Sequence, residues 1–559
     1  MSKYFLLIFP LFLAATISTA EEPSIEKIKN ANFDEAEITD VRHICAGEKI
    51  GGTKASTDML LIAARAHPPS KVKIALALPV ADKWNGIFLG KGNGGMGDRV
   101  SVEMAVNGAN IGYATAHCDL GTEKWWEDAD NLDVVLADFG HDAVYMMTKL
   151  GKKAAQIFYG KPPKYSYYLG GSTGGQEGLS MAERHPAEYD GIALLFPVSD
   201  RTSLHIRFMF EKALLFPGGH FTDEQISKIS EEIVKQNRNN EGEPENSSKP
   251  YLKYPERAKV DYSKFDFLSK NQIDLLIRIH SPFLDPATRA FITFGLPPSC
   301  EIADNGKSLK NGFDDWMSAW FFRRANIDPS KVDLHKYAIE FKKRFSQDTD
   351  AAPNLGKFRK YGKKLLIIQG KIDTIVPAEY IKDWYKLLCK NTGSTEKTLE
   401  YARVFLVPGG WHGNMSGVDM LQAIRDWVEK NSEPNRIKVN VAVKGVNYPE
   451  DAQLYIPRQQ FRSRISTTRQ IRLKKIVWSK RLKRGISPTT YKWDAIICNI
   501  LKHAKNRPGT PIKCLTNICL LKKKNGDEKC NTLGCIGYSW TRRGFCRKQD
   551  PVRQRRNKG

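Results

Sequence analysis

The chain has 559 residues and a formal net charge of +24, and this charge is confined to one end. Residues 431–559 hold 31 Lys and Arg against 7 Asp and Glu, whereas residues 1–430 hold 55 of each kind. No recognised nucleic-acid-binding motif accompanies the basic residues, so the composition argues against specific nucleic-acid binding as the main function.

The first twenty residues have the pattern of a signal peptide. Lys3 supplies a positive charge, residues 4–15 are apolar, and Ser18 and Ala20 are the small residues that precede a cleavage site. No later segment has an apolar run long enough to span a bilayer. We therefore expect a secreted or periplasmic protein without a transmembrane segment.

Two apolar strands near the N-terminus lead into a glycine-rich turn. Residues 71–78 alternate apolar side chains, and residues 86–90 form a second apolar run that ends just before the turn at 92–95. Such a turn lets a backbone N–H approach a substrate oxygen, so Gly94 and Gly95 are candidates for one side of an oxyanion hole. An ordinary flexible loop is the alternative interpretation.

Residues 170–174 have the pattern G-x-S-x-G, centred on Ser172. An apolar run at 165–169 precedes the pattern and a helical stretch at 175–184 follows it. A strand, a sharp turn and a helix around this pattern are typical of the nucleophile elbow of α/β-hydrolases. We predict Ser172 as the nucleophile and the N–H of Thr173 as a second oxyanion donor.

About two hundred residues lie between the elbow and the next predicted core strand, far more than one crossover needs. They predict an inserted lid with helical stretches that include 223–234 and 270–279. Most aromatic side chains of the lid are expected to pack its own core, and the others are candidates for holding an aromatic acyl group. These aromatics include Phe208, Phe210, Trp316, Trp320, Phe321 and Phe322.

An acid and a base follow the next two strands, in the order that α/β-hydrolases use. The run at 365–369 is followed by Asp373, and the run at 404–407 is followed by His412. Polar residues at the ends of parallel strands meet at one edge of the sheet. We predict that His412 is the general base and that Asp373 orients it, although Asp373 also fits a simple turn former.

Several segments together resemble the tannase and feruloyl esterase family of secreted serine esterases, over residues 37–435. The elbow, Asp373 and His412 fall on positions of the family's triad. The other matching segments are 84–86, 88–90, 92–95, 112–115, 119–121, 139–140, 158–163, 184–186 and 189–192. The resemblance implies an α/β-hydrolase core that acts on aromatic esters such as hydroxycinnamoyl or galloyl esters.

The chain departs from that family in two ways. The family has disulfide-linked cysteines before the nucleophile and after the triad histidine, where this chain has Gly171 and Gly413. The family's lid also carries an aspartate- and glycine-rich calcium loop, and the corresponding stretch at 239–246 contains no aspartate. We therefore expect a less rigid triad and neither a cofactor nor a bound metal.

The predicted layout has five parts. A signal peptide occupies 1–20, the α/β-hydrolase core occupies 21–199 and 356–435, a lid insertion occupies 200–355, and a basic tail occupies 436–559. The core is expected to end after a helix at 419–430.

The basic tail holds six of the ten cysteines, from Cys498 to Cys546, without the paired spacing of a zinc site. Three interpretations stay open: a disordered polycation that binds anionic polymers or surfaces, a disulfide-stapled module, or sequence beyond the natural end of the esterase. The other four cysteines allow three pairings if all are oxidised. They are Cys45, Cys118, Cys300 and Cys389.

The sequence thus predicts a secreted serine carboxylic ester hydrolase that acts on aromatic esters through an acyl-enzyme. The alternative is a catalytically inactive hydrolase scaffold whose basic tail binds anionic polymers or surfaces. Retention of the serine, the acid and the base favours the enzyme.

Overall fold

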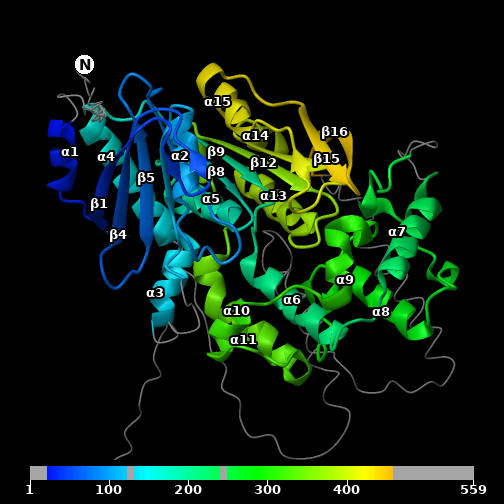
Figure 1. The fold of residues 1–559 in the computed structure, drawn as a ribbon. Helices are drawn as coiled ribbons and strands as arrows, with labels where there is room; N and C mark the ends of the chain where they lie inside the picture. The colour runs from blue at the N-terminus through cyan, green and yellow to red at the C-terminus, as the bar shows by residue number, and fades with distance from the viewer. Residues whose placement is uncertain (1–21, 123–130, 240–247, 458–559) are drawn as a thin grey trace, which may run out of the picture. The chain divides into compact units, whose positions relative to one another are not determined.

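A twelve-stranded mixed sheet organises the part of the chain that the computed structural model describes, residues 22–122, 131–239 and 248–457 (Figure 1). The strand order is β1-β4-β5-β7-β6-β8-β9-β12-β13-β16-β15-β14. The strands are β1 (Ala36–Ile44), β4 (Met59–Ala66), β5 (Lys73–Pro79), β6 (Ile87–Lys91), β7 (Ala114–Cys118), β8 (Tyr165–Gly171), β9 (Gly191–Leu195), β12 (Lys364–Gly370), β13 (Ala402–Val407), β14 (Met415–Ser416), β15 (Ile437–Val443) and β16 (Val446–Leu454). Two small ribbons pair β2 (Lys49–Ile50) with β3 (Thr53–Lys54) and β10 (Phe283–Leu284) with β11 (Phe291–Thr293).

The six central strands, from β7 to β13, run parallel to one another. Along β12, Leu365 and Ile367 pack on one face of the sheet, while Leu366 and Ile368 pack on the other. Parallel strands that are buried on both faces need such continuous apolar runs. The parallel region and its helices confirm the α/β-hydrolase type of fold.

Helices cover both faces of this sheet (Figure 1). One face is covered by α1 (Glu22–Lys29), α4 (Ala143–Tyr159), α5 (Thr173–Arg184) and α13 (Ala378–Thr392). The other is covered by α2 (Val102–Asn110) and α15 (Met420–Lys430). Short helices α3 (Leu132–Ala137) and α14 (Thr395–Leu399) lie in connections, and a π-helical turn spans Asp138–Asp142.

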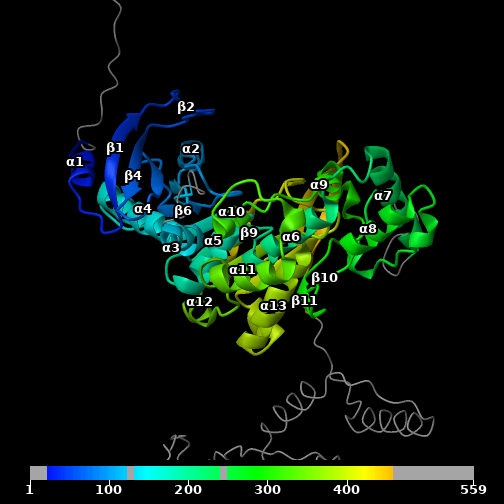
Figure 2. The same ribbon diagram turned by 90° about the horizontal axis from the view of Figure 1, so that it is seen from below.

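The lid lies between β9 and β12 in the sequence and is mainly helical. Figures 1 and 2 show α10 and α11 beside α3, while α7 and α8 lie apart from them. Its helices are α6 (Arg201–Leu215), α7 (Asp223–Asn237), α8 (Lys270–His280), α9 (Lys307–Asn311), α10 (Met317–Phe322) and α11 (Leu334–Thr349), and α12 (Gly356–Lys360) follows at the start of the second part of the core. Short 3-10 turns span Pro255–Arg257, Tyr262–Lys264, Cys300–Gly306 (η5) and Pro329–Lys331.

The end of the core that we predicted at residue 435 is wrong. The β15–β16 hairpin follows it, and β16 pairs with β13 through Phe405 and Leu454. Alternate side chains of β15 are buried, so the hairpin is part of the core rather than of the basic tail. The predicted boundary followed the change in charge, and the excess of basic residues begins before the last two strands of the sheet.

Several predicted features lie outside the described residues: the signal peptide at 1–20, most of the 239–246 stretch, and the tail from 458 onward. Cys45, Cys118, Cys300 and Cys389 form no disulfide with one another. Within the described ranges, no helix combines the length and the apolar character needed to cross a bilayer.

Candidate active site

The three candidate catalytic residues follow the ends of neighbouring parallel strands. Ser172 comes directly after β8, Asp373 follows β12, and His412 follows β13. In the sheet, β9 lies between β8 and β12, and β13 lies next to β12. The carboxyl ends of these strands therefore bring all three residues to one edge of the sheet, as the sequence predicted.

The backbone at Ser172 is strained in the way that an elbow requires. Its φ is 56° and its ψ is −116°, a backbone conformation that residues other than glycine rarely adopt. A Cβ atom at Gly170 would lie 2.3 Å from the carbonyl oxygen of Gly174, so the turn has room only for glycine there. The N–H of Ser172 donates to the carbonyl of Leu195 at 3.0 Å, which fixes the turn against the end of β9.

Asp373 and His412 form a hydrogen-bonded pair. Nδ1 of His412 lies 3.0 Å from Oδ2 of the fully buried Asp373. The other oxygen, Oδ1, accepts hydrogen bonds from the backbone N–H groups of Ile375 and Val376 at 2.9 and 3.0 Å. With the carboxylate as acceptor, Nδ1 carries the proton, and Nε2 is left as the free acceptor of the imidazole.

The candidate oxyanion donors lie in two segments that are joined by hydrogen bonds. Thr173 begins α5, so its N–H has no partner in the helix ladder. Its hydroxyl donates to the carbonyl of Gly95 at 2.6 Å, and the N–H of Gly174 donates to the carbonyl of Asn93 at 2.7 Å. A Cβ atom at Gly94 or Gly95 would meet no atom within 4 Å, so both glycines border open space.

Comparison with known proteins gives this geometry its context. The sequence model described as "Tannase and feruloyl esterase" matches residues 61–257 and 303–465. The chain belongs to the tannase and feruloyl esterase family. The second matched segment extends past residue 435 and includes β15 and β16, in agreement with the sheet.

Relatives of this esterase have similar chains and folds. A probable feruloyl esterase B-2 of Aspergillus flavus is 26% identical over 446 residues, which cover 71% of this chain and 81% of that protein. The crystal structure of feruloyl esterase B from Aspergillus oryzae matches with a TM-score of 0.67 at 20% identity, covering 78% and 96% of the two chains. The tannin acyl hydrolase from Aspergillus niger matches with a TM-score of 0.62 at 16% identity, covering 78% and 91%. Family membership makes the chain a carboxylic ester hydrolase.

A buried polar network behind the elbow of the esterase was missed by the sequence analysis. Glu177 on α5 accepts hydrogen bonds from Asn93 Nδ2 at 3.1 Å and from the Tyr168 hydroxyl at 2.6 Å. Burial raises the pKa of Glu177, and the hydrogen bonds from Tyr168 and Asn93 oppose that rise. Arg201 donates to the Thr173 hydroxyl at 2.9 Å. The network therefore holds the glycine-rich turn against the elbow.

The loop that carries His412 is held by the hairpin that the predicted boundary had excluded. Asn414 accepts a hydrogen bond from the N–H of Trp411 at 2.7 Å and donates to the carbonyls of Gly409 and Ala442 at 3.2 Å. The N–H of Ala442, on β15, donates back to the carbonyl of Asn414 at 3.0 Å. The position of His412 therefore depends on residues beyond 435.

Phe196 packs against His412 and was also missed. The two ring centroids lie 4.1 Å apart, and Phe196 adopts a positive φ of 35°. A Cβ atom at Gly171 would lie 3.1 Å from the Phe196 ring, so this ring takes the space of a side chain at position 171. In this esterase an aromatic contact thus restrains the histidine where the family resemblance implies a disulfide.

Replacing Phe196 with alanine should lower kcat by about tenfold and change KM little. The ring limits rotation of His412, and a misplaced general base loses rate even when substrate binding is intact. Steady-state kinetics on a soluble ester would measure this effect. Phe291→Ala is the matched control, because that ring is 55% exposed and contacts Phe294 instead. An unchanged kcat in Phe196→Ala would show that the contact does not position the base.

Most of the candidate lid aromatics pack inside the protein, but they join the cluster that packs on the central sheet and not, as we had expected, a core of the lid's own. Phe208, Phe210 and Trp320 are buried, and Trp316 packs edge-on against Phe139 and Trp320. Phe208 belongs to a small apolar cluster with Val376, which follows Asp373 on the loop after β12.

A groove of about 550 Å³ borders the elbow. Its lining residues come from the ends of β6 and β8, from α2 and from the start of α15. They include Lys91, Gly92, Met104, Gly170, Gly171 and Leu421.

Proposed function

We propose that this chain is a secreted serine esterase that hydrolyses aromatic esters, of the hydroxycinnamoyl or galloyl type, through an acyl-enzyme. The observation that carries the proposal is the hydrogen bond between His412 and Asp373. It lies at the carboxyl ends of the parallel strands, where the strained Ser172 also lies. The substrate class is suggested by the relatives, which are named feruloyl esterases and a tannin acyl hydrolase.

In the proposed acylation step, Oγ of Ser172 attacks the ester carbonyl carbon. Nε2 of His412 accepts the serine proton, and Asp373 stabilises the imidazolium while holding its Nδ1–H. The tetrahedral oxyanion accepts hydrogen bonds from the N–H of Thr173 and from Gly94 or Gly95. His412 then protonates the leaving alcohol, and the acyl group remains on Ser172.

In the proposed deacylation step, His412 accepts a proton from a water molecule, which attacks the acyl carbon. The same backbone donors stabilise the second oxyanion. As this intermediate collapses, the bond between the acyl carbon and Oγ breaks, His412 returns its proton to Oγ of Ser172, and the acid is released.

A panel of esters together with a covalent probe tests the proposal. We expect release of acid from methyl ferulate or methyl gallate, with slower turnover of the corresponding aliphatic methyl esters. A fluorophosphonate should label the folded protein, and peptide mass spectrometry should place the label on Ser172. Folded protein that neither turns over any ester nor takes the label would instead support the inactive scaffold with a binding tail.

A further inference from the structure

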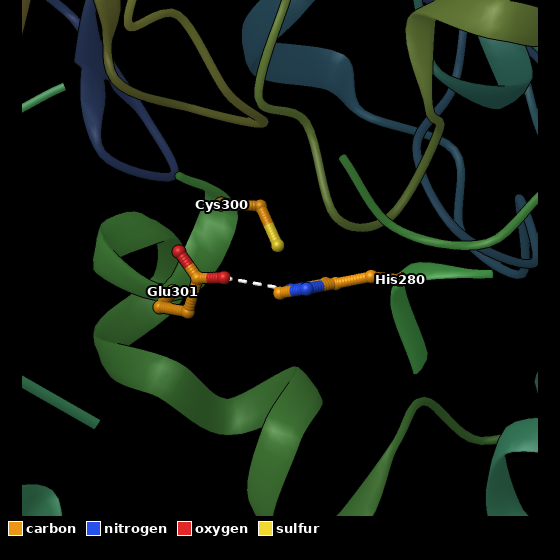
Figure 3. Close-up of side chains that lie close together, drawn as sticks. All are labelled: His280, Cys300 and Glu301. Carbon is orange, nitrogen blue, oxygen red and sulfur yellow. Dashed lines mark ion pairs between the residues drawn. The ribbon is translucent and has the colours of Figure 1, made fainter. Parts of the chain in front are cut away.

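Three potential metal ligands meet in the lid, away from the residues of the proposed reaction. His280 is the last residue of α8, and Cys300 and Glu301 open η5. One ligand atom from each residue lies within 4.8 Å of the other two. Figure 3 shows the Cys300 sulfur and the Glu301 carboxylate directed toward the His280 ring.

This cluster is buried, and its polar atoms are poorly satisfied. The side chains of His280 and Glu301 are 3% and 0% exposed, and Cys300 is fully buried. Nε2 of His280 lies 2.7 Å from Oε1 of Glu301, but the two atoms lack the geometry of a hydrogen bond. Neither oxygen of Glu301 has a hydrogen-bond partner within the part of the chain that the structure describes. Because buried carboxylates are normally fully hydrogen-bonded, the site calls for a further partner.

The second nitrogen of His280 has a partner of its own. Nδ1 lies 3.0 Å from the hydroxyl of Tyr262. The phenol oxygen can accept a hydrogen bond from Nδ1–H of the imidazole. That tautomer leaves a lone pair on Nε2, directed at the cluster. Histidines that bind metals commonly use their other nitrogen in this way.

We propose that His280, Cys300 and Glu301 bind a Zn²⁺ ion. Imidazole nitrogen, thiolate sulfur and carboxylate oxygen are together a typical zinc ligand set, whereas Ca²⁺ and Mg²⁺ prefer oxygen ligands alone. Bonds of about 2.0–2.3 Å to a tetrahedral ion place ligand atoms roughly 3.5 Å apart, so modest side-chain rotations close this site. A water molecule would complete the four ligands.

The charges balance when zinc is bound. Zinc binding releases the thiol proton to solvent, and the thiolate and the Glu301 carboxylate then neutralise the two positive charges. A plain His280–Glu301 ion pair is the alternative, but it leaves Oε2 of Glu301 without a partner.

The ion would connect the lid to the loop of Asp373. In η5, Asp304 accepts a hydrogen bond from the hydroxyl of Thr374 at 3.0 Å, next to Asp373. Zinc that joins α8 to η5 would therefore brace the lid where it contacts the catalytic loop. The role that we infer for it is structural.

Metal stoichiometry on the full chain tests the inference. Protein stripped with a chelator is reloaded with Zn²⁺, desalted and analysed for zinc, and a Co²⁺-loaded sample is examined for thiolate-to-cobalt charge-transfer absorption. We expect Cys300→Ser and Glu301→Gln each to bind about one equivalent less zinc than the unmodified chain. Cys389→Ser, at another buried cysteine outside the tail, should bind the full amount. The tail cysteines are the same in all variants, so they cancel in the comparison.

Thermal unfolding gives an independent measurement. Saturating Zn²⁺ should raise the Tm of the stripped chain and of Cys389→Ser by about 3 °C, and should leave Glu301→Gln unchanged. Equal zinc content, cobalt spectra and Tm shifts in all variants would overturn the proposal. Should Cys300→Ser fail to fold, Glu301→Gln decides alone, because glutamine keeps the size of the side chain. None of these measurements depends on esterase activity.

Discussion

Replacing Ser172 with alanine is expected to lower kcat/KM for a soluble ester by about 10⁴-fold or more. The alanine chain has no oxygen that can form the acyl-enzyme, although substrate binding and the oxyanion donors remain. KM should change much less than kcat, and the fluorophosphonate label should disappear. Steady-state kinetics with methyl ferulate and p-nitrophenyl acetate would measure both parameters.

Ser180→Ala is the matched control for that substitution. Ser180 lies on the same helix as the elbow and is 4% exposed, but it is two turns beyond Ser172. Its replacement should leave kcat/KM within about twofold of the unmodified chain, since it removes a hydroxyl without touching the proposed reaction. Hydrolysis that persists unchanged in Ser172→Ala would remove this serine from the mechanism and leave the proposed acyl-enzyme without support.

A chain that ends at residue 440 is expected to lose the esterase activity almost completely, whereas one that ends at residue 457 should keep it. The shorter chain lacks β16 and half of β15. It therefore loses the hydrogen bonds of Ala442 to Asn414, which hold the His412 loop. It also loses Glu450, which accepts a hydrogen bond from Tyr251 of the lid at 2.6 Å.

Activity and folding should be measured together on the two shortened chains. The chain ending at 457 should unfold cooperatively, with a Tm close to that of the full chain and kcat/KM within about twofold. It lacks 28 Lys and Arg against 4 Asp and Glu, so its salt-dependent binding to an anionic resin should fall sharply. Full activity in the chain ending at 440 would show that the hairpin is dispensable. If the chain ending at 457 fails to fold, the esterase domain needs residues after 457 for its stability.

Local patterns in the sequence were enough to predict the elbow and the strands around it. The run predicted at 165–169 became β8 (Tyr165–Gly171), and the run at 365–369 became β12 (Lys364–Gly370). Buried parallel strands need unbroken apolar runs, and a sharp turn needs glycine, so both features are visible in short windows. The helix at 419–430 was predicted nearly as it stands in α15.

The boundary of the core was a different case. Every second residue from 437 to 443 is a branched apolar one, and the residues between them are Lys438, Asn440 and Ala442. This is close to the pattern of a half-buried strand, but the charge shift at the same place favoured a separate tail. The pairing of β16 with β13 shows that the strand pattern, and not the change in charge, marks the end of the core. Strand pairing joins residues far apart in the sequence, and composition carries no information about it.

The sequence by itself determined the family, the elbow and the order of the serine, the acid and the base, because each depends on a few adjacent residues. The tertiary structure decided what surrounds them: the Phe196 ring against His412, the contact between Asn414 and β15, and the cluster of His280 with Cys300 and Glu301. These contacts depend on how the lid and the hairpin pack on the sheet. Packing brings together side chains that no local pattern links, and it therefore fixes the orientation of the candidate catalytic groups, which the sequence can name but not orient.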